Sequence, residues 1–268
     1  WQGERYLPEL LSSLAAQTWP RLRIRVRDDG STDGTVPLLH EFASGREAVE
    51  VVEGENLGVV GSFHELLGGG EGNAEDELYA FCDQDDVWLP DKIERAVRRI
   101  LRTPDPASTL YCGRLIYTDA ALREIGRSRV PSHLGFRNAV VENIAVGCTV
   151  VFGERIRRLL RRGRPGDMMM HDWWAYLAAS AFGTVVYDEE PRILYRQHGE
   201  NLAGWEGRAR KIANRTRGLF RRLFAGVQGM DSLNQAVRFV ETYGDLVPAE
   251  MRAVVERLLR LRGPGRLG

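Results

Sequence analysis

The chain is predicted to adopt an α/β fold, with a mainly parallel sheet and helices on both of its faces. Three observations predict it. Helix and strand patterns alternate along the first third of the chain, and polar loops follow the predicted strands. With 268 residues, of which 43% are hydrophobic, the chain is also long enough to bury a large core.

The spacing of hydrophobic residues places each element of the first third. Over residues 4–17, leucines recur on one helical face, and Pro8 fits the first turn. Over residues 22–27, hydrophobic residues alternate with arginine, which predicts a strand. The further elements predicted before residue 105 are strands at 49–52 and 78–82 and helices at 63–67 and 91–101.

The second part of the chain mixes the two patterns less regularly. Its predicted strands are 109–118, 146–152, 185–187 and 193–195, and its predicted helices are 154–162 and 173–182. From about Trp205 the sequence becomes arginine-rich and helical, without strand patterns. We therefore expect a mixed α/β region followed by a helical tail.

Composition narrows the classes of protein. The formal net charge is zero, so no global positive field indicates nucleic-acid binding. The three cysteines, Cys82, Cys112 and Cys148, are widely spaced, which fits buried free thiols in a reducing compartment better than a disulfide framework or a zinc site. No hydrophobic run approaches the ~20 residues that a membrane span needs, and no signal peptide is evident. A cytoplasmic location is therefore expected.

Three carboxylates fall within the four residues 83–86, directly after the predicted strand at 78–82. Carboxylates packed this closely repel one another, so a fold keeps them together when a cation lies among them. A divalent cation whose shell is completed by phosphate oxygens suits such a site. The alternative is a solvated acidic turn, since Pro90 and Asp91 are typical of a helix start.

A second acidic loop, at 28–35, follows the predicted strand at 22–27. In open α/β sheets ligands bind beyond the carboxyl ends of the strands, so we expect the two acidic loops to face the same crevice. Asp28 and Asp29 can accept hydrogen bonds from a pyrimidine or a ribose. The alternative is a turn in which a polar residue at 31–33 caps the next helix, and both interpretations can hold together.

Six segments occur along the chain in a definite order: DDGSTDGT, NLGVVGSF, FCDQDDVWLPDK, GC, HDWW and YRQHG. With these segments, residues 2–204 resemble family 2 glycosyltransferases, and among them the bacterial rhamnosyltransferase-like members. The resemblance implies the GT-A fold of nucleotide-diphospho-sugar transferases, a Rossmann-like mixed sheet with helices on both faces. It implies a nucleotide-binding half at 1–105 and an acceptor half at 106–204, followed by a basic helical C-terminal extension at 205–268.

The family pattern also contains a first strand, which forms part of the nucleotide pocket. Only Gln2-Gly3-Glu4 corresponds to the end of that strand here, and Gln2 stands where asparagine is common. The first strand is therefore expected to be missing. This supports an alternative function, in which a degenerate, N-terminally truncated GT-A domain binds sugar or a partner without turnover.

The resemblance assigns the residues that would hold the sugar donor. Asp29, with Asp28 beside it, would contact the nucleotide base or ribose. The DxD-type motif would hold the metal and the donor diphosphate through Asp83 and Asp85, with Asp86 close to the sugar. Three residues near the end of the domain complete this set. His198 would be a further metal ligand, with Arg196 and Gln197 near the phosphates.

The resemblance also assigns the acceptor side of the site. Asp172 would be the general base that takes the proton of the acceptor hydroxyl, and a single displacement of this kind inverts the anomeric centre. Aromatic neighbours raise the pKa of such a carboxyl, while a helix N-terminus lowers it. The alternative role for Asp172 is a helix N-cap. Gly147, Cys148 and Trp173 are expected near the acceptor, with Cys148 as a small buried residue.

The implied cofactor is a divalent cation. Mg²⁺ suits an oxygen-rich shell, and an imidazole ligand makes Mn²⁺ equally suitable. Its charge would neutralise the departing diphosphate as a Lewis acid.

The extension contains a basic amphipathic stretch at 208–224. One interpretation is a solvated helix packed on the domain. The other is an interfacial helix on an anionic membrane, where lipid-linked acceptors would be met. The second interpretation would place the protein peripherally at the inner face of the plasma membrane.

Together these patterns predict an inverting, metal-dependent glycosyltransferase. The resemblance implies dTDP-rhamnose as the nucleotide-diphospho-sugar donor and a cell-surface polysaccharide or polyprenyl-linked glycan as the acceptor. A phosphatase or nucleotidyltransferase with acids at strand ends is another class of enzyme. Aspartyl phosphatases place the nucleophilic carboxylate near the start of the chain, with a Thr or Val after the second aspartate. The segment Asp85-Asp86-Val87 fits this pattern poorly.

Overall fold

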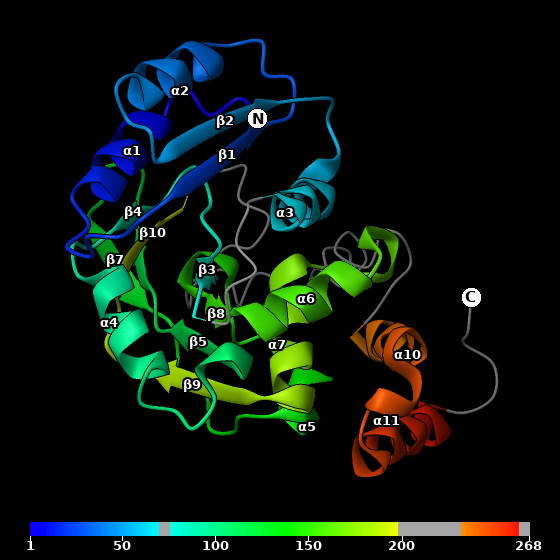
Figure 1. The fold of residues 1–268 in the computed structure, drawn as a ribbon. Helices are drawn as coiled ribbons and strands as arrows, with labels where there is room; N and C mark the ends of the chain where they lie inside the picture. Colours follow the sequence, from blue (N-terminus) through cyan, green and yellow to red (C-terminus); the bar gives the residue numbers. More distant parts are fainter. Residues whose placement is uncertain (70–75, 198–231, 263–268) are drawn as a thin grey trace, which may run out of the picture.

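The computed structural model describes residues 1–69, 76–197 and 232–262. Its N-terminal layer is a two-stranded parallel sheet of β1 (Ile24–Asp28) and β2 (Val49–Glu53). Helices pack around this sheet, as Figure 1 shows. They are α1 (Leu7–Ala15), α2 (Thr35–Ala43) and α3 (Gly58–Gly68).

Two four-stranded sheets follow. The first has the order β3-β8-β5-β9, with β3 at Leu78–Ala80, β8 at Val151–Gly153, β5 at Thr109–Gly113 and β9 at Thr184–Asp188. The second has the order β4-β10-β6-β7, with β4 at Val87–Trp88, β10 at Ile193–Arg196, β6 at Ile116–Thr118 and β7 at Glu124–Arg127. The acidic residues 83–86 lie between β3 and β4 and so connect the two sheets.

The α/β class is confirmed, but the expectation of a mainly parallel sheet is wrong. In the described residues the pairs β1–β2, β5–β9 and β6–β10 are parallel, whereas β3–β8, β5–β8, β4–β10 and β6–β7 are antiparallel. Alternating helix and strand patterns predict parallel strands that are joined by crossover connections. Short antiparallel strands do not produce a distinct pattern, so the sequence did not reveal them. The result is a mixed sheet, as the GT-A resemblance implies.

Two predicted strands are also revised. The strand predicted at 109–118 is two strands, because the chain leaves one sheet after Gly113 and joins the other at Ile116. The strand predicted at 146–152 pairs only from Val151, since residues 147–149 form a 3₁₀ turn. Continuous hydrophobic runs predict burial in both segments, but they carry no sign of where a strand changes sheet.

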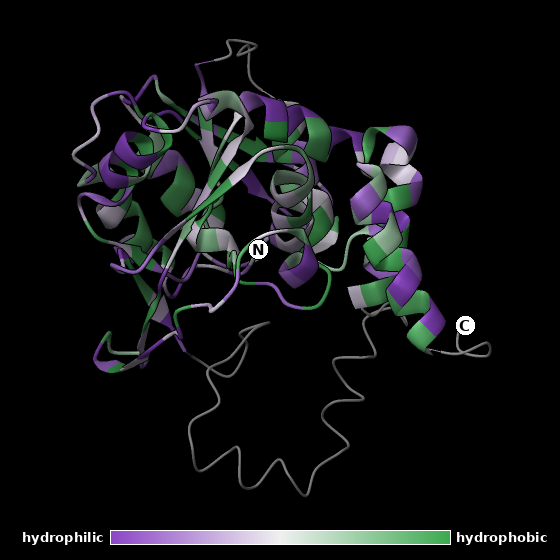
Figure 2. Ribbon diagram, turned by 90° about the horizontal axis from the view of Figure 1, so that it is seen from below, coloured by the Kyte–Doolittle hydropathy of each residue, from purple (hydrophilic) through white to green (hydrophobic). Residues whose placement is uncertain are grey.

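The main helices cover the sheets with hydrophobic faces turned inward, and Figure 2 shows hydrophilic residues mostly on the outside. They are α4 (Lys92–Ile100), α5 (Phe136–Ala139), α6 (Glu154–Arg162) and α7 (His171–Phe182). Helix α4 is also fixed by charge. Buried Asp188 on β9 forms salt bridges with Arg95, at 2.5 Å, and Arg99, at 3.1 Å, and accepts a hydrogen bond from the Tyr111 hydroxyl.

The described part of the C-terminal extension packs on the domain. It forms α10 (Ser232–Tyr243) and α11 (Ala249–Arg262), which lie beside α7 in Figure 1. Phe239 and Tyr243 are buried against Trp174 and Phe182. No helix in the described ranges is long and apolar enough to cross a membrane. The predicted basic stretch 208–224 and the predicted ligand His198 lie outside the described residues.

Candidate active site

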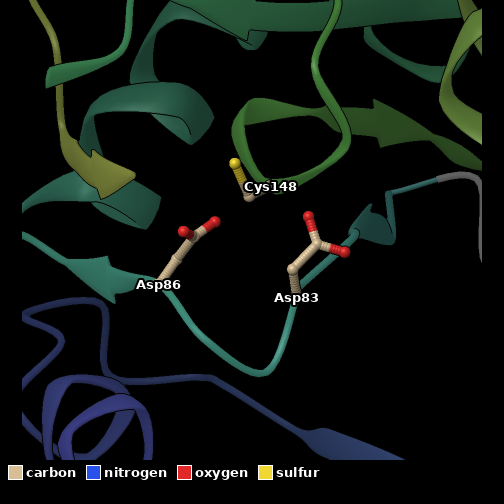
Figure 3. A group of neighbouring side chains, drawn as sticks. All are labelled: Asp83, Asp86 and Cys148. Atoms are coloured by element: carbon tan, nitrogen blue, oxygen red, sulfur yellow. The ribbon is translucent and has the colours of Figure 1, made fainter. Parts of the chain in front are cut away.

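The acidic loop at 83–86 gathers three carboxylates, of which Asp86 is buried and Asp83 and Asp85 are half-buried. Asp83 and Asp86 lie on either side of Cys148 (Figure 3), and one ligand atom from each of the three residues lies within 4.8 Å of the others. Cys148 comes from the 3₁₀ turn before β8, which runs antiparallel to β3. The pairing of β3 with β8 therefore brings the predicted acceptor residue Cys148 beside the predicted donor residues.

Asp86 is fully buried and only partly satisfied by hydrogen bonds. One carboxylate oxygen accepts the backbone N–H of Arg196 at 3.1 Å, while Oδ2 has no hydrogen-bond partner among the described residues. Burial raises the pKa of the Asp86 carboxyl well above its ordinary value, and the charges of Asp83 and Asp85 raise it further. A buried carboxylate oxygen without a donor is the kind of group that a cation satisfies.

Asp83 carries the same excess of negative charge. Burial raises the pKa of its carboxyl to about 7, with further contributions from the charges of Asp85 and Asp172. The positive charge of Lys92 acts in the opposite direction. The effect of Asp172 on Asp83 shows that the predicted base and the acidic loop belong to one electrostatic site.

Lys92 is a site residue that the sequence patterns did not reveal. Its ammonium group is buried 3.3 Å from the centroid of the Trp88 ring, without a hydrogen-bond partner in the described part of the chain. Burial lowers its pKa to about 8, while nearby acidic groups such as Asp86 raise it. The available signal was its place on the inward face of α4 with Ile93 and Ala96, where a lysine is rare.

These residues fit a divalent cation of the hard class. Asp83 and Asp86 present carboxylate oxygens, including the unsatisfied Oδ2, and Lys92 is the internal cation that faces them. Mg²⁺ and Mn²⁺ prefer such oxygens, whereas the thiol of Cys148 suits softer metals. Burial raises the pKa of that thiol well above its ordinary value, so it is protonated at neutral pH. Asp85 lies outside the 4.8 Å group, although its charge acts on both Asp83 and Asp86.

The second acidic loop is tied down by its own hydrogen bonds. Asp28 accepts the backbone N–H of Ser31 at 2.7 Å, which closes the turn after β1. Asp29 pairs with Arg27 and accepts the N–H of Leu57 at 3.1 Å. Both carboxylates are buried and held in a turn. The expected N-cap at residues 31–33 is not formed, because the N-cap of α2 is Gly34.

Residues 2–4 join the two acidic loops. Gln2 donates its backbone N–H to the Ser31 hydroxyl at 2.8 Å, and its amide exchanges hydrogen bonds with Thr32. Gly3 lies against the acidic loop, because a Cβ atom built on it would be 2.9 Å from Oε1 of Gln84. The two loops therefore lie on the same side of the molecule, as expected from their places at strand ends. Gln2 has φ +53°, a conformation that favours asparagine or glycine.

Asp172 lies in the first turn of α7 and is held in one orientation. One oxygen accepts the N–H of Gly147 at 2.8 Å, and the other accepts the N–H of Trp173 at 2.6 Å. Burial raises its pKa to about 6, against the lowering effect of these bonds. Met170 precedes the helix, so Asp172 is not its N-cap. A Cβ on Gly147 would make an ordinary contact with Oδ2 of Asp172, at 3.5 Å, and a tighter one with Nε2 of His171, at 3.2 Å.

His171 fills the core beside the base. Its ring stacks on Phe63 at 3.9 Å between centroids and meets the edge of Phe81 at 4.6 Å. Burial lowers the pKa of the imidazole to about 3, so the ring is neutral. His171 thus packs α7 against α3 and against Phe81, which precedes the acidic loop.

The remaining predicted residues within the described part of the chain are Arg196, Gln197 and Trp173. The Arg196 guanidinium is buried and donates to the carbonyl oxygens of Asp85, at 2.9 Å, and Ala120, at 2.6 Å. Gln197 donates its backbone N–H to the carbonyl of Thr118 at 2.8 Å. Trp173 donates its indole N–H to the carbonyl of Ala139 at 2.6 Å. Of these three residues, Arg196 is therefore the one that directly contacts the acidic loop, and the roles of all three stay predictions.

Two solved structures share this fold. A mannosyltransferase from Pyrobaculum calidifontis in complex with GDP-Man and Mn²⁺ matches with a TM-score of 0.50 at 19% identity, over 97% of this chain and 72% of its own. GalNAc-T7 with UDP, GalNAc and Mn²⁺ matches with a TM-score of 0.57 at 11% identity, over 95% of this chain and 54% of its own. The fold is the GT-A fold of glycosyltransferases.

The sequence profile of glycosyl transferase family 2 matches residues 2–162, and the chain belongs to this family of transferases. The dTDP-rhamnosyl transferase RfbG of Shigella flexneri is 27% identical over 214 residues, 76% of this chain and 72% of RfbG. The UDP-Glc:alpha-D-GlcNAc-diphosphoundecaprenol beta-1,3-glucosyltransferase WfgD of Escherichia coli is 25% identical over 156 residues, 58% of this chain and 57% of WfgD. An uncharacterised glycosyltransferase of a Nostoc strain is 32% identical over 108 residues, but these span only 32% of that relative.

Proposed function

We propose that this chain transfers a sugar from a nucleotide-diphosphate donor to a hydroxyl group of a glycan, with inversion at the anomeric carbon. The observation that supports this proposal is the convergence of Asp83, Asp86 and Asp172. Their carboxyl pKa values are raised by burial, and the charge of Asp172 contributes to the shift of Asp83. Donor-binding and proton-accepting groups would thus share one buried acidic site.

A divalent cation, Mn²⁺ or Mg²⁺, is the proposed cofactor. Asp85 is the proposed ligand from the acidic loop, as the family resemblance implies. Asp83, on the donor side, and Asp86, near the sugar, would supply the further carboxylate oxygens that face the same cation. His198, outside the described residues, is the proposed second ligand. When bound, the cation would supply Lewis-acid stabilisation of the departing diphosphate. The buried guanidinium of Arg196 fixes the backbone of Asp85, and Gln197 follows it along the chain near the proposed phosphate position.

Asp172 is the proposed general base. A pKa of about 6 leaves its carboxylate mostly ionised at neutral pH and still basic enough to accept a hydroxyl proton in the transition state. The backbone N–H groups of Gly147 and Trp173 fix both of its oxygens, so the carboxylate is oriented before the acceptor arrives. Gly147, Cys148 and Trp173 are the proposed surroundings of the acceptor.

The proposed donor is dTDP-rhamnose. This proposal is supported by the likeness to RfbG, a dTDP-rhamnosyl transferase. Asp28 and Asp29 are the proposed contacts to the base or ribose. The proposed acceptor is a cell-surface polysaccharide or a polyprenyl-linked glycan, since WfgD is named for a diphosphoundecaprenol-linked one. A cytoplasmic enzyme that visits the inner face of the plasma membrane would meet both substrates.

Calorimetric titration tests this function directly. dTDP, UDP and GDP are each titrated into the purified chain with and without Mn²⁺, and the series is repeated with Asp85→Ala. We expect one nucleotide to bind only with Mn²⁺, and the variant to lose this binding. If no nucleotide binds to the folded protein, the degenerate-domain alternative replaces the enzyme.

A further inference from the structure

Helix α6 exposes only arginine side chains to solvent. Its opposite face, which includes Ile156 and Leu160, is buried in the core. Exposed helix faces normally mix the two signs of charge, so a face of arginine alone concentrates positive potential. We call it the α6 arginine face, and it consists of Arg155, Arg158, Arg161, Arg162 and, just after the helix, Arg164.

Neighbouring carboxylates neutralise only part of this charge. Arg155 pairs with Asp105 at 2.9 Å, and Arg158 pairs with buried Glu154 at 2.8 Å. The remaining three arginines have no carboxylate within 4.0 Å in the part of the chain that the structure describes; they are Arg161, Arg162 and Arg164. The protein as a whole has a formal net charge of zero, so this is a local positive surface.

A pocket of about 470 Å³ adjoins the α6 arginine face. Its walls include Arg155, Arg158 and Arg162 together with Leu159, Phe182 and Leu246. Ser108 and Asp105 complete the lining, and the carboxylate of Asp105 is paired with Arg155. Leu246, between α10 and α11, is 53% exposed although it is hydrophobic. Guanidinium groups bind phosphates, and the apolar wall suits a hydrocarbon chain. The two chemistries side by side match an anionic lipid, whereas a nucleic acid or a free phosphate would leave the apolar wall unused.

We propose that the α6 arginine face docks on a membrane surface rich in anionic lipids. A lipid phosphate lies among the arginines, and the upper part of its acyl chain covers Leu159, Phe182 and Leu246. This surface is distinct from the basic stretch 208–224 and from the acidic loop. The docking is independent of nucleotide binding and of the sugar that is transferred, so it is tested without any activity measurement.

The test is co-sedimentation of the full chain with vesicles. One set consists of phosphatidylcholine alone, and the other of phosphatidylcholine and phosphatidylglycerol in equal amounts. The test variant carries Arg161→Glu, Arg162→Glu and Arg164→Glu. The matched control carries the same charge change at exposed arginines near α1 and β1, namely Arg5→Glu, Arg21→Glu and Arg23→Glu. Circular dichroism verifies that both variants are folded.

We expect the wild type and the control to bind the anionic vesicles. The affinity of the test variant should be at least roughly tenfold lower, because each arginine near an anionic leaflet strengthens binding severalfold. Added salt should weaken the wild-type binding, since it screens exposed charges. Equal loss in both variants would mean that only net charge matters, and no loss in either would place membrane contact elsewhere in the chain. Binding to heparin or nucleic acid without binding to vesicles would also overturn the proposal.

Discussion

At the scale of single residues, burial decides the chemistry of the acidic site. Asp83 and Asp172 have carboxyl pKa values raised to about 7 and about 6, whereas exposed carboxyls titrate near 4. The sequence located these residues through their spacing and through the family segments. Their protonation behaviour depends on how deeply neighbouring strands and helices cover them, which spacing does not encode.

Replacing the proposed base tests its role. In Asp172→Asn the carboxamide keeps the shape of the side chain but cannot accept the acceptor proton. We expect kcat to fall roughly 10²–10⁴-fold while nucleotide affinity stays the same. The measurement is kcat with saturating donor and Mn²⁺, beside calorimetry of the nucleotide. An unchanged kcat would remove Asp172 from the mechanism.

The pH profile of the wild type checks the same residue. The base must be ionised to act, and its pKa is raised to about 6. We therefore expect kcat to be level above about pH 6 and to fall tenfold per pH unit below it. A profile that stays level down to pH 4 would mean that another group accepts the proton.

His171 should make the protein sensitive to acid. Its pKa is about 3 in the folded state, below the ordinary 6.5, so the unfolded state binds the proton more tightly. The stability that this residue contributes is complete above about pH 6.5 and is lost as the pH falls toward 3. Between pH 6.5 and 5 the loss amounts to about 2 kcal/mol.

Urea unfolding of His171→Phe measures this effect. The phenyl ring preserves the stack on Phe63 and does not titrate, so the variant should lose about 2 kcal/mol less stability than the wild type between pH 6.5 and 5. The control is His133→Phe, at a solvent-exposed position. Parallel pH dependence in wild type and His171→Phe would show that His171 is not held neutral.

At the scale of elements, the site depends on the close approach of the 3₁₀ turn 147–149 to the first turn of α7. A Cβ on Gly147 would be 3.2 Å from Nε2 of His171, a tight contact that presses on the first turn of α7, and 3.5 Å from Oδ2 of Asp172, an ordinary contact. The sequence predicted a strand through this turn and a helix beginning at 173. The contact between the two elements could not be read from either pattern.

Gly147→Ala should therefore displace the base without disturbing the donor site. We expect kcat to fall roughly tenfold or more, since small misplacements of catalytic groups are costly, and dTDP binding to remain. Gly166→Ala is the control, because its Cβ would meet nothing within 4 Å. The measurements are kcat of the two variants from steady-state kinetics and nucleotide binding by calorimetry. An equal kcat in both variants would mean that the turn adjusts to the added methyl group.

At the scale of the whole molecule, the C-terminal helices share the core of the catalytic domain. Phe239 of α10 is fully buried among Trp174, Phe182 and Tyr243. Tyr243 donates its hydroxyl to the carbonyl of Leu159 at 2.7 Å and accepts the indole N–H of Trp174 at 3.1 Å. Helix α7, which carries Asp172, thus packs against a segment for which the sequence predicted only a basic helical extension.

Truncating this contact should destabilise the entire protein. We expect Phe239→Ala to lower the free energy of unfolding by about 3–5 kcal/mol, because it removes a buried aromatic ring and leaves a cavity. Leu261→Ala, at a position that is 79% exposed, should change it by less than about 0.5 kcal/mol. Urea unfolding followed by far-ultraviolet circular dichroism measures both. If only the C-terminal helices melted in Phe239→Ala, they would form a separate unit.

The sequence by itself determined the α/β class, the family, the two acidic loops and the candidate base, because these depend on local periodicity and on short ordered motifs. The tertiary structure was needed to establish the mixed strand order, the break between Gly113 and Ile116, and the burial of Lys92 over the Trp88 ring. It also brought Cys148 to Asp83 and Asp86, and α10 to the back of α7. These features arise from pairing and burial between segments far apart in the chain, and local patterns do not specify which distant segments meet.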